Sequence, residues 1–318
     1  MKQNNFELKS DCPVVVIGAA GVDIVGRLEG DLHEGSSNPA RIRTTFGGVA
    51  RNVAENLARL GQAVILLTAV GEDEEGERLV RNAQIAGVNT KYIIRCGDCP
   101  TGMYVGILNS KGEILFALDS MEVTHNITPA YIRQRSQLFK GASFVFIDLN
   151  LPPETLRAIY SLAKRYRVPV CADPTSMHLA PRLMPFLGQT FLITPNFSEA
   201  SLLAKQPRKA PSRRQALLIA KTLVSQGVDI VIITMAEQGL CYASSETNGH
   251  IPAIQTEILD PTGAGDALTA AVLFALLNAM PLDDALRLGV SAATLTLQYP
   301  GAVVPDLSLE KLYDQLVI

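Results

Sequence analysis

The residues most able to carry chemistry lie in the run Asp260-Pro261-Thr262-Gly263-Ala264-Gly265-Asp266. Its two glycines open an apolar helix, where several backbone N–H groups are free at the positive end of the helix dipole and can bind an anion. We expect these donors to keep the Asp266 carboxylate ionised and able to accept a proton. The run therefore suits general-base activation of a hydroxyl during phosphoryl transfer. An aspartate that only stabilises the helix dipole is the alternative.

A second glycine pair opens another helix in the run Phe46-Gly47-Gly48-Val49-Ala50-Arg51-Asn52. Gly47 and Gly48 would let a ligand approach the backbone closely. Asn52 lies one helical turn after Gly48 and points back to the same helix end. The alternative is a common joint between a loop and a helix, with no ligand.

The third run, Thr194-Pro195-Asn196-Phe197-Ser198-Glu199, directly follows an apolar segment. Asn196 and Glu199 are three residues apart at a helix start and share a face, so they could hold water ligands of Mg²⁺. A capping box, with Asn196 as the N-cap and Glu199 as its partner, is the competing explanation. The two roles are compatible.

Composition and missing motifs exclude several other classes of protein. Lys and Arg number 28 against 31 Asp and Glu, without a basic block, so nucleic acid is not expected as a partner. The apolar stretch 267–280 contains Thr269 and Asn278 and is shorter than the roughly 20 residues that span a bilayer, so no membrane is expected. The polar N-terminus and five scattered cysteines indicate a cytoplasmic protein without a disulfide framework. Neither a Walker-type phosphate loop nor a dinucleotide fingerprint is present.

Alternating strand and helix patterns must position these motifs. Apolar runs without polar alternation predict strands covered on both faces, at 14–17, 64–68, 144–147, 168–172, 191–194 and 230–234. Helical periodicity follows at 49–60, 75–85, 154–166, 212–225, 265–278 and 282–297. This order is typical of βαβ units around a parallel sheet.

Two segments, 22–46 and 92–119, interrupt this order with short alternating strands and with turns at Asn38-Pro39 and Lys111-Gly112. We expect the two segments to pair with each other as a small β-rich flap, rather than to join the parallel sheet. Two surface hairpins without a role are the alternative. The simplest domain organisation is one domain over 1–318 with this flap.

In their order along the chain, the three runs resemble the ribokinase-like (PfkB) carbohydrate kinase family over nearly the whole sequence. The resemblance implies an α/β fold of three layers, α/β/α, with a mainly parallel central sheet and a small β-sheet lid formed by the two excursions. It also implies an enzyme that uses ATP and Mg²⁺ to phosphorylate a primary hydroxyl of a sugar or nucleoside.

The resemblance assigns roles to the residues that match the family's signatures. Asp266 would be the base, and Gly263, Ala264 and Gly265 would form the anion hole for the migrating phosphoryl group. Asp23 would bind sugar hydroxyls, and three residues would lie beside it: Gly47, Gly48 and Asn52.

Further matches concern the nucleotide and metal ions. Asn196 and Glu199 fit the family's N-x-x-E element for nucleotide and Mg²⁺, with Glu199 acting through water. Thr234 and Gly239 fit its T-x-G-x-x-G nucleotide loop, in which Ala236 replaces the usual Gly. Together with the segment 291–304, two residues could supply carbonyl and hydroxyl ligands for K⁺: Asp260 and Thr262.

Within the family, Ser37-Asn38-Pro39, the Gly47–Asn52 run and the stretch 106–119 most resemble members that phosphorylate the 5′-hydroxyl of pseudouridine. Lid residues near Asn38 would then recognise the base. A ribokinase or another sugar or nucleoside kinase is the alternative, and a non-catalytic sugar- or nucleotide-binding regulator would have no use for Asp266. A homodimer formed through the lid is consistent with the resemblance.

Overall fold

A mainly parallel eight-stranded sheet forms the centre of the computed structural model, which describes residues 11–207 and 210–316. The strand order is β14-β13-β12-β11-β10-β9-β1-β4, in which only β13 and β14 run antiparallel to their neighbours. The strands are β1 (Val14–Ile17), β4 (Val64–Leu67), β9 (Val145–Asp148), β10 (Val170–Asp173), β11 (Leu192–Ile193), β12 (Ile230–Thr234), β13 (Leu240–Ser244) and β14 (Asn248–Ile251).

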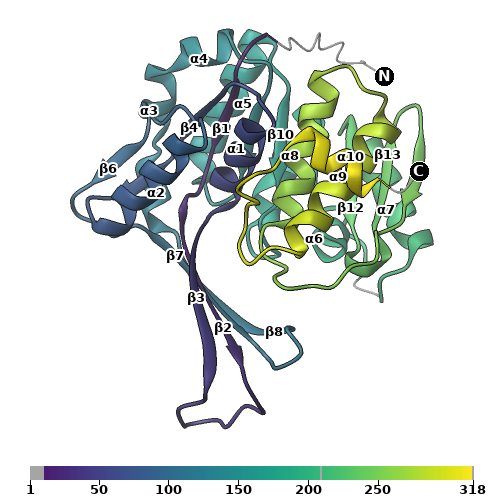
Figure 1. Ribbon diagram of the computed structural model, residues 1–318. Coiled ribbons are helices and arrows are strands. Elements are labelled where there is room, and N and C mark those ends of the chain that lie inside the picture. Colours follow the sequence, from purple (N-terminus) through teal and green to yellow (C-terminus); the bar gives the residue numbers. More distant parts are fainter. Residues whose placement is uncertain (1–10, 208–209, 317–318) are drawn as a thin grey trace.

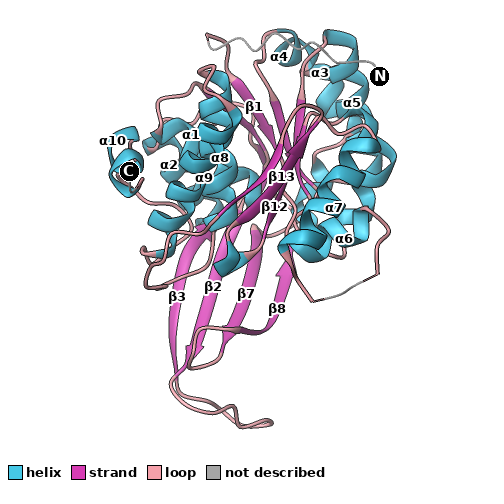
Figure 2. Cartoon of the chain, turned by 90° about the vertical axis from the view of Figure 1, so that its right-hand side faces the viewer, coloured by secondary structure: helices cyan, strands magenta, loops and turns pink. Residues whose placement is uncertain are grey.

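Helices cover both faces of this sheet, which explains why its strands lack polar alternation (Figure 2). Along β1, Val14 and Val16 pack into one hydrophobic core, and Val15 and Ile17 pack into the other. The first layer contains α1 (Val49–Arg59), α2 (Glu74–Ile85), α8 (Ala264–Leu277), α9 (Leu282–Leu297) and α10 (Leu309–Gln315). The second contains α3 (Pro129–Gln134), α4 (Ser136–Lys140), α5 (Pro153–Tyr166), α6 (Phe197–Leu203) and α7 (Arg213–Ser225). The predicted fold class is confirmed.

The two excursions pair with each other in a four-stranded sheet that projects from the main body (Figure 1). Its order is β3 (Ala40–Gly47), β2 (Gly21–Leu28), β7 (Gly102–Leu108) and β8 (Ile114–Ser120). β2 and β7, far apart in the sequence, run parallel in the middle of this sheet. We call these four strands the lid.

The second excursion contributes less to the lid than its predicted range. Within 92–101, the strand β6 (Ile94–Cys96) pairs with β5 (Ala69–Gly71) in a separate two-stranded sheet, so the lid begins only at Gly102. Three 3₁₀ helices complete the described structure: η1 (Glu122–Asn126), η2 (Ala180–Gln189) and η3 (Ala236–Gln238). Within the described residues, none of the helices has the length and apolar character needed to span a bilayer.

Candidate active site

The N-terminus of α8 begins at Gly263, whose left-handed backbone (φ 77°) only glycine adopts readily. A Cβ there would also lie 2.1 Å from the carbonyl oxygen of Ala302, so the chain packs too closely for any side chain. Gly265 differs, because a Cβ on it would meet nothing within 4 Å. The side-chain position of Gly265 is therefore open space at the start of α8, where an anionic group could approach the helix N-terminus.

Asp266, in the first turn of α8, accepts a hydrogen bond on Oδ2 from Nδ2 of Asn52, at 2.8 Å. The pKa of Asp266 is raised to about 7, chiefly by burial and also by the carboxylates of Asp23 and Asp148, against the lowering effects of the Asn52 hydrogen bond and the Arg51 cation. The expectation that helix N-terminal donors hold this carboxylate fully ionised is therefore wrong in direction. A pKa near neutrality suits a general base.

Asp23 extends from β2 into the same region and is only 5% exposed. Burial raises its pKa to about 7, Arg51 lowers it and Asp260 raises it. A Cβ on Gly47 would lie 2.0 Å from an Asp23 carboxylate oxygen. The Asp23 carboxylate therefore occupies the space that any side chain at position 47 would need. Among the described residues, none donates a hydrogen bond to the Asp23 carboxylate, which leaves it available to a ligand.

Asp148, at the end of β9, holds the glycine-rich start of α1 in place. Its fully buried Oδ2 accepts hydrogen bonds from the backbone N–H of Ala19 (2.7 Å) and of Ala50 (3.1 Å). Gly48, with φ 92°, packs directly on the Ala19 carbonyl, 2.6 Å from where its Cβ would lie. Protein packing therefore already requires glycine at 48. The sequence analysis missed Asp148, although its position directly after an apolar strand was a usable signal.

The structure brings together three of the residues predicted to bind the nucleotide and Mg²⁺: Asn196, Glu199 and Thr234. Asn196 forms an isolated bridge with Thr234, at the end of β12. Asn196 and Glu199 also make both hydrogen bonds of a capping box, so the capping explanation of this motif is confirmed. Burial raises the pKa of Glu199, whose side chain lies at the start of α6.

Asp173, at the end of β10, is a further site residue that the sequence analysis missed. Burial raises its pKa well above the ordinary value, and the carboxylates of Glu199 and Asp266 add to the effect. Its Oδ2 accepts a hydrogen bond from Thr194, whose hydroxyl in turn accepts one from Thr269 of α8, each at 3.1 Å. These hydrogen bonds link the end of β10 to the helix that carries Asp266.

The loop at 234–239 shows how the backbone accommodates Ala236. Ala236, where the family usually has Gly, adopts a left-handed backbone with φ 49°. Gly239, with φ 85°, packs against the Ile251 carbonyl oxygen, 2.1 Å from where its Cβ would lie. Ala236 thus adopts a conformation that glycine adopts more easily, and this lowers the folding stability by about 1 kcal/mol.

Asp260 is committed to contacts within the protein. Its Oδ1 accepts the N–H of Thr262 at 3.0 Å, and its Oδ2 lies 3.2 Å from the guanidinium of Arg43 on β3. This ion pair connects the lid to the loop that opens α8. The backbone N–H of Asp260 also donates to the carbonyl of Leu297, which places the segments 260–262 and 291–304 side by side.

The structure does not bring Asn38 into this group of residues. It lies in the connection between β2 and β3, at the far end of the lid (Figure 1). Its amide is occupied locally, because it accepts from the N–H of His33 and donates to the carbonyls of His33 and Ser36. Tyr104 of β7, by contrast, pairs directly with Asp23 across the lid and is half-buried.

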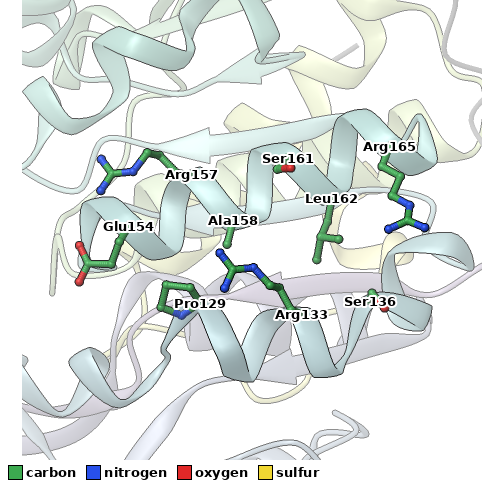
Figure 3. A pocket seen from close by; sticks show the side chains of 9 residues that line it. All are labelled: Pro129, Arg133, Ser136, Glu154, Arg157, Ala158, Ser161, Leu162 and Arg165. Atoms are coloured by element: carbon green, nitrogen blue, oxygen red, sulfur yellow. The ribbon is translucent and has the colours of Figure 1, made fainter.

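A surface pocket of about 550 Å³ lies between α5 and the segment that contains α3 (Figure 3). Arg133, Arg157 and Arg165 line it, with Glu154 at one end. It contains none of the residues discussed above. Its position in the outer helical layer separates it from the strand ends and the lid.

Comparison with known proteins gives the context of this geometry. The sequence matches the pfkB family carbohydrate kinases over residues 13–308. It is 31% identical to pseudouridine kinase of Escherichia coli (strain K12), over 93% of this chain and 94% of that protein.

Solved structures agree in fold. Ribokinase of Arabidopsis thaliana, complexed with ribose and ATP, matches with a TM-score of 0.81 at 24% identity, over 96% of this chain and 99% of that one. A putative ribokinase II from E. coli, in complex with ATP and Mg²⁺, matches with a TM-score of 0.82 at 18% identity, over the same shares.

The architecture is thus that of the ribokinase-like class, a three-layer α/β/α body with a β-sheet lid. The chain belongs to the pfkB family of carbohydrate kinases. It is accordingly a phosphotransferase with an alcohol group as acceptor. The two glycine-containing runs that resemble the family's signatures open α1 and α8.

Proposed function

We propose that this kinase transfers the γ-phosphoryl group of ATP to the 5′-hydroxyl of pseudouridine, and that the whole chain acts as one kinase domain with its lid. The observation that carries the proposal is the hydrogen-bonded pair Asn52–Asp266 at the open N-terminus of α8, with the buried Asp23 carboxylate near it. The 31% identity to an E. coli pseudouridine kinase supports the choice of acceptor.

The proposed mechanism follows from these positions. Asp23 binds ribose hydroxyls and holds the 5′-hydroxyl near Asp266. Asp266 accepts the hydroxyl proton as the oxygen attacks the γ-phosphorus, the bond from that phosphorus to the β,γ-bridging oxygen breaks, and ADP leaves. The free N–H groups of Gly263, Ala264 and Gly265 stabilise the negative charge on the migrating phosphoryl group. The backbone at Gly47 and Gly48 and the side chain of Asn52 complete the acceptor side.

ATP would lie along Asn196, Thr234 and Gly239, at the ends of β11 and β12. Bound Mg²⁺ would neutralise charge on the nucleotide phosphates. The side chains of Asp173 and Glu199 offer the oxygen ligands that Mg²⁺ prefers, and they lie close enough for the Glu199 charge to raise the pKa of Asp173. Within 11–207 and 210–316, no three His, Cys, Asp or Glu side chains form a direct metal cluster, so Glu199 would act through water.

The lid is proposed to recognise the base. Asn38 lies at the lid end with its amide occupied, so Tyr104, opposite Asp23, is the better placed residue to contact the base.

A panel of acceptors distinguishes a pseudouridine kinase from the alternative, a ribokinase. We expect a higher kcat/KM with pseudouridine than with ribose or uridine, and a preference for free ribose would favour the alternative.

The activity should depend on pH through Asp266. Because a base must be deprotonated and the pKa of Asp266 is about 7, kcat/KM should rise as pH increases through 7 and fall about tenfold per pH unit well below it. Asp23 has a similar pKa, so the two carboxyls titrate over the same pH range. The acidic side of the pH profile, its acid limb, therefore reports the titration of both groups together. The measurement is kcat/KM at saturating MgATP against pH, and a profile that stays flat down to about pH 5.5 would contradict it.

We also propose a K⁺ site between the loop at 260–262 and the segment 291–304. Their adjacency supports it, through the bond from Asp260 N–H to the Leu297 carbonyl. The Asp260 carboxylate is already paired with Arg43, so backbone carbonyls and the Thr262 hydroxyl would be the ligands. Turnover should be higher in KCl than in NaCl at equal ionic strength, and equal rates would exclude the site.

A homodimer through the lid is the proposed assembly. Strand register places Asp23, Tyr104 and Asp119 on one lid face and apolar side chains on the other. That apolar face contains Ile24, Ile42, Met103, Val105, Ile107, Phe116 and Leu118. Ile42, Phe116 and Leu118 are 69%, 51% and 64% exposed. An apolar face of this kind marks an interface, and two copies related by a two-fold axis would cover it.

Leu118→Asp should therefore weaken the dimer by roughly 30-fold or more, the effect of losing an interface contact worth about 2 kcal/mol. Light scattering after size-exclusion chromatography measures the assembly. Leu218→Asp is the matched control, since Leu218 is similarly exposed (59%) but lies on α7. A wild-type protein that is monomeric at all concentrations would overturn the assembly.

A further inference from the structure

The buried side chain of Arg51 is the centre of a hydrogen-bond network that reaches the proposed base. Arg51 lies on α1 and is 3% exposed. Its Nη1 donates to the carbonyl oxygen of Phe46 and to Oδ1 of Asn52, both at 3.0 Å. Its Nη2 donates to the Glu55 carboxylate and to Oδ1 of Asn82, on α2. Its two terminal nitrogens are thus held by four partners.

This network determines which way the Asn52 amide faces. With Oδ1 toward the guanidinium, Nδ2 faces Asp266 and donates to its Oδ2. The reverse orientation would set the amide NH₂ against the Arg51 donors and the amide oxygen against a carboxylate, so both contacts would be repulsive. A neutral or apolar residue at 51 would leave the Asn52 amide oriented by Asp266 alone.

We propose that Arg51 is a positioning residue for phosphoryl transfer, which orients the Asn52 amide and through it holds the Asp266 carboxylate. The inference rests on the proposed function, because it takes Asp266 as the base. It assigns to Arg51 an effect on the rate of transfer, beyond any effect on folding.

The charge of Arg51 provides a second readout. Asp266 is faced by the carboxylates of Asp23, Asp148 and Asp173 and by the Arg51 cation. The carboxylates raise the pKa of Asp266 and the Arg51 cation lowers it. Removing the cation should therefore shift the acid limb of the pH profile to higher pH.

Arg59 is a matched control on the same helix. Its Nε and Nη2 donate to Oε1 of Glu55, the same carboxylate that Arg51 binds through Oε2. Replacement of either arginine therefore removes one ion pair with Glu55. Arg59 makes no contact with Asn52 among its hydrogen bonds, so only Arg51→Met breaks the path to Asp266.

The experiment compares Arg51→Met, Arg51→Lys and Arg59→Met in the full chain. We expect Arg51→Met to lower kcat roughly 10- to 100-fold, the effect of a misplaced reacting group, with KM for ATP within about threefold. Its acid limb should move upward by at least about half a pH unit. Arg51→Lys keeps the positive charge but cannot make the same set of hydrogen bonds. Its acid limb should therefore lie at the wild-type pH, while its kcat should stay low. Arg59→Met should match the wild type both in kcat and in the pH of the acid limb.

Thermal unfolding identifies variants that fold, and Arg51→Lys is the fallback if Arg51→Met does not. Equal kcat values and equal limbs for the Arg51 and Arg59 variants would overturn the proposal. A carboxyl ¹³C NMR titration of Asp266, assigned with Asp266→Asn, makes the test independent of activity. A raised pKa in Arg51→Met with an inactive wild-type enzyme would support the contact and reject the proposed function. An unchanged pKa and kcat in an active enzyme would reject the role of Arg51 alone.

Discussion

Asp266→Asn should lower kcat by roughly 10²- to 10⁴-fold, the contribution of a positioned general base. The amide keeps the shape of the side chain but cannot accept the hydroxyl proton. Binding of ATP and of the acceptor should stay within about tenfold of the wild type, because neither depends on that proton. Calorimetry for binding and a coupled assay for turnover measure the two quantities.

Two controls separate this role from stabilisation of the helix dipole. Asp284 also lies in the first turn of a helix, α9, but outside the site, so Asp284→Asn should leave kcat unchanged. An aspartate that only stabilises the dipole would lose about 0.3–1 kcal/mol of folding free energy when replaced. Burial raises the pKa of Asp266, so its ionised form is unfavourable in the folded state and Asp266→Asn should be no less stable at pH 8. Wild-type kcat in Asp266→Asn would reject Asp266 as the base.

A 2′-deoxynucleoside should be a poor acceptor, with kcat/KM lower than that of its ribo form by up to about 10⁴-fold. The cause is Asp23, which is 5% exposed and accepts no hydrogen bond from the described residues. A ribose hydroxyl would satisfy this carboxylate, and a deoxy analogue that covers the site would leave it buried and unpaired. Asn52 contributes less, because Arg51 and Asp266 already occupy its amide.

The comparison requires kcat/KM for one nucleoside in its ribo and deoxyribo forms, in the wild type and in Asp23→Ala. The variant should lose most of the discrimination along with much of its activity. Nucleosides that share a ribose but differ in the base should differ less steeply than the two sugar forms do. Efficient use of the deoxynucleoside by the wild type would contradict the role of Asp23 and leave the kinase assignment in place.

The parallel body and the order of the motifs were predictable from the sequence, because both depend on local patterns. Buried strands such as β1 and β12 are uninterrupted apolar runs, and the helices α8 and α9 follow glycine or proline. The antiparallel strands β13 and β14 were missed. The lid boundary was also misplaced, since the strand β6 pairs with β5 outside the lid and short strands carry no signal of their partner.

The site was predictable only where its residues form runs. Asp148 and Asp173 are lone aspartates at the ends of β9 and β10, and their position at the end of an apolar run is the one signal that marks them. The pKa of Asp266 was predicted in the wrong direction because the helix N-terminus is a local feature. The effect of the helix N-terminus is outweighed by burial and by the carboxylates of Asp23 on β2 and Asp148 on β9, which lie far away in the sequence.

The most direct test of the proposed function is the product of one reaction. Purified protein is incubated with MgATP and pseudouridine, and the product is examined by ³¹P NMR and mass spectrometry. The proposed mechanism predicts a nucleoside monophosphate whose phosphorus couples to the two 5′ protons, formed by the wild type and nearly absent with Asp266→Asn. Phosphate on another position, or free ribose phosphorylated while pseudouridine is left unchanged, would contradict it.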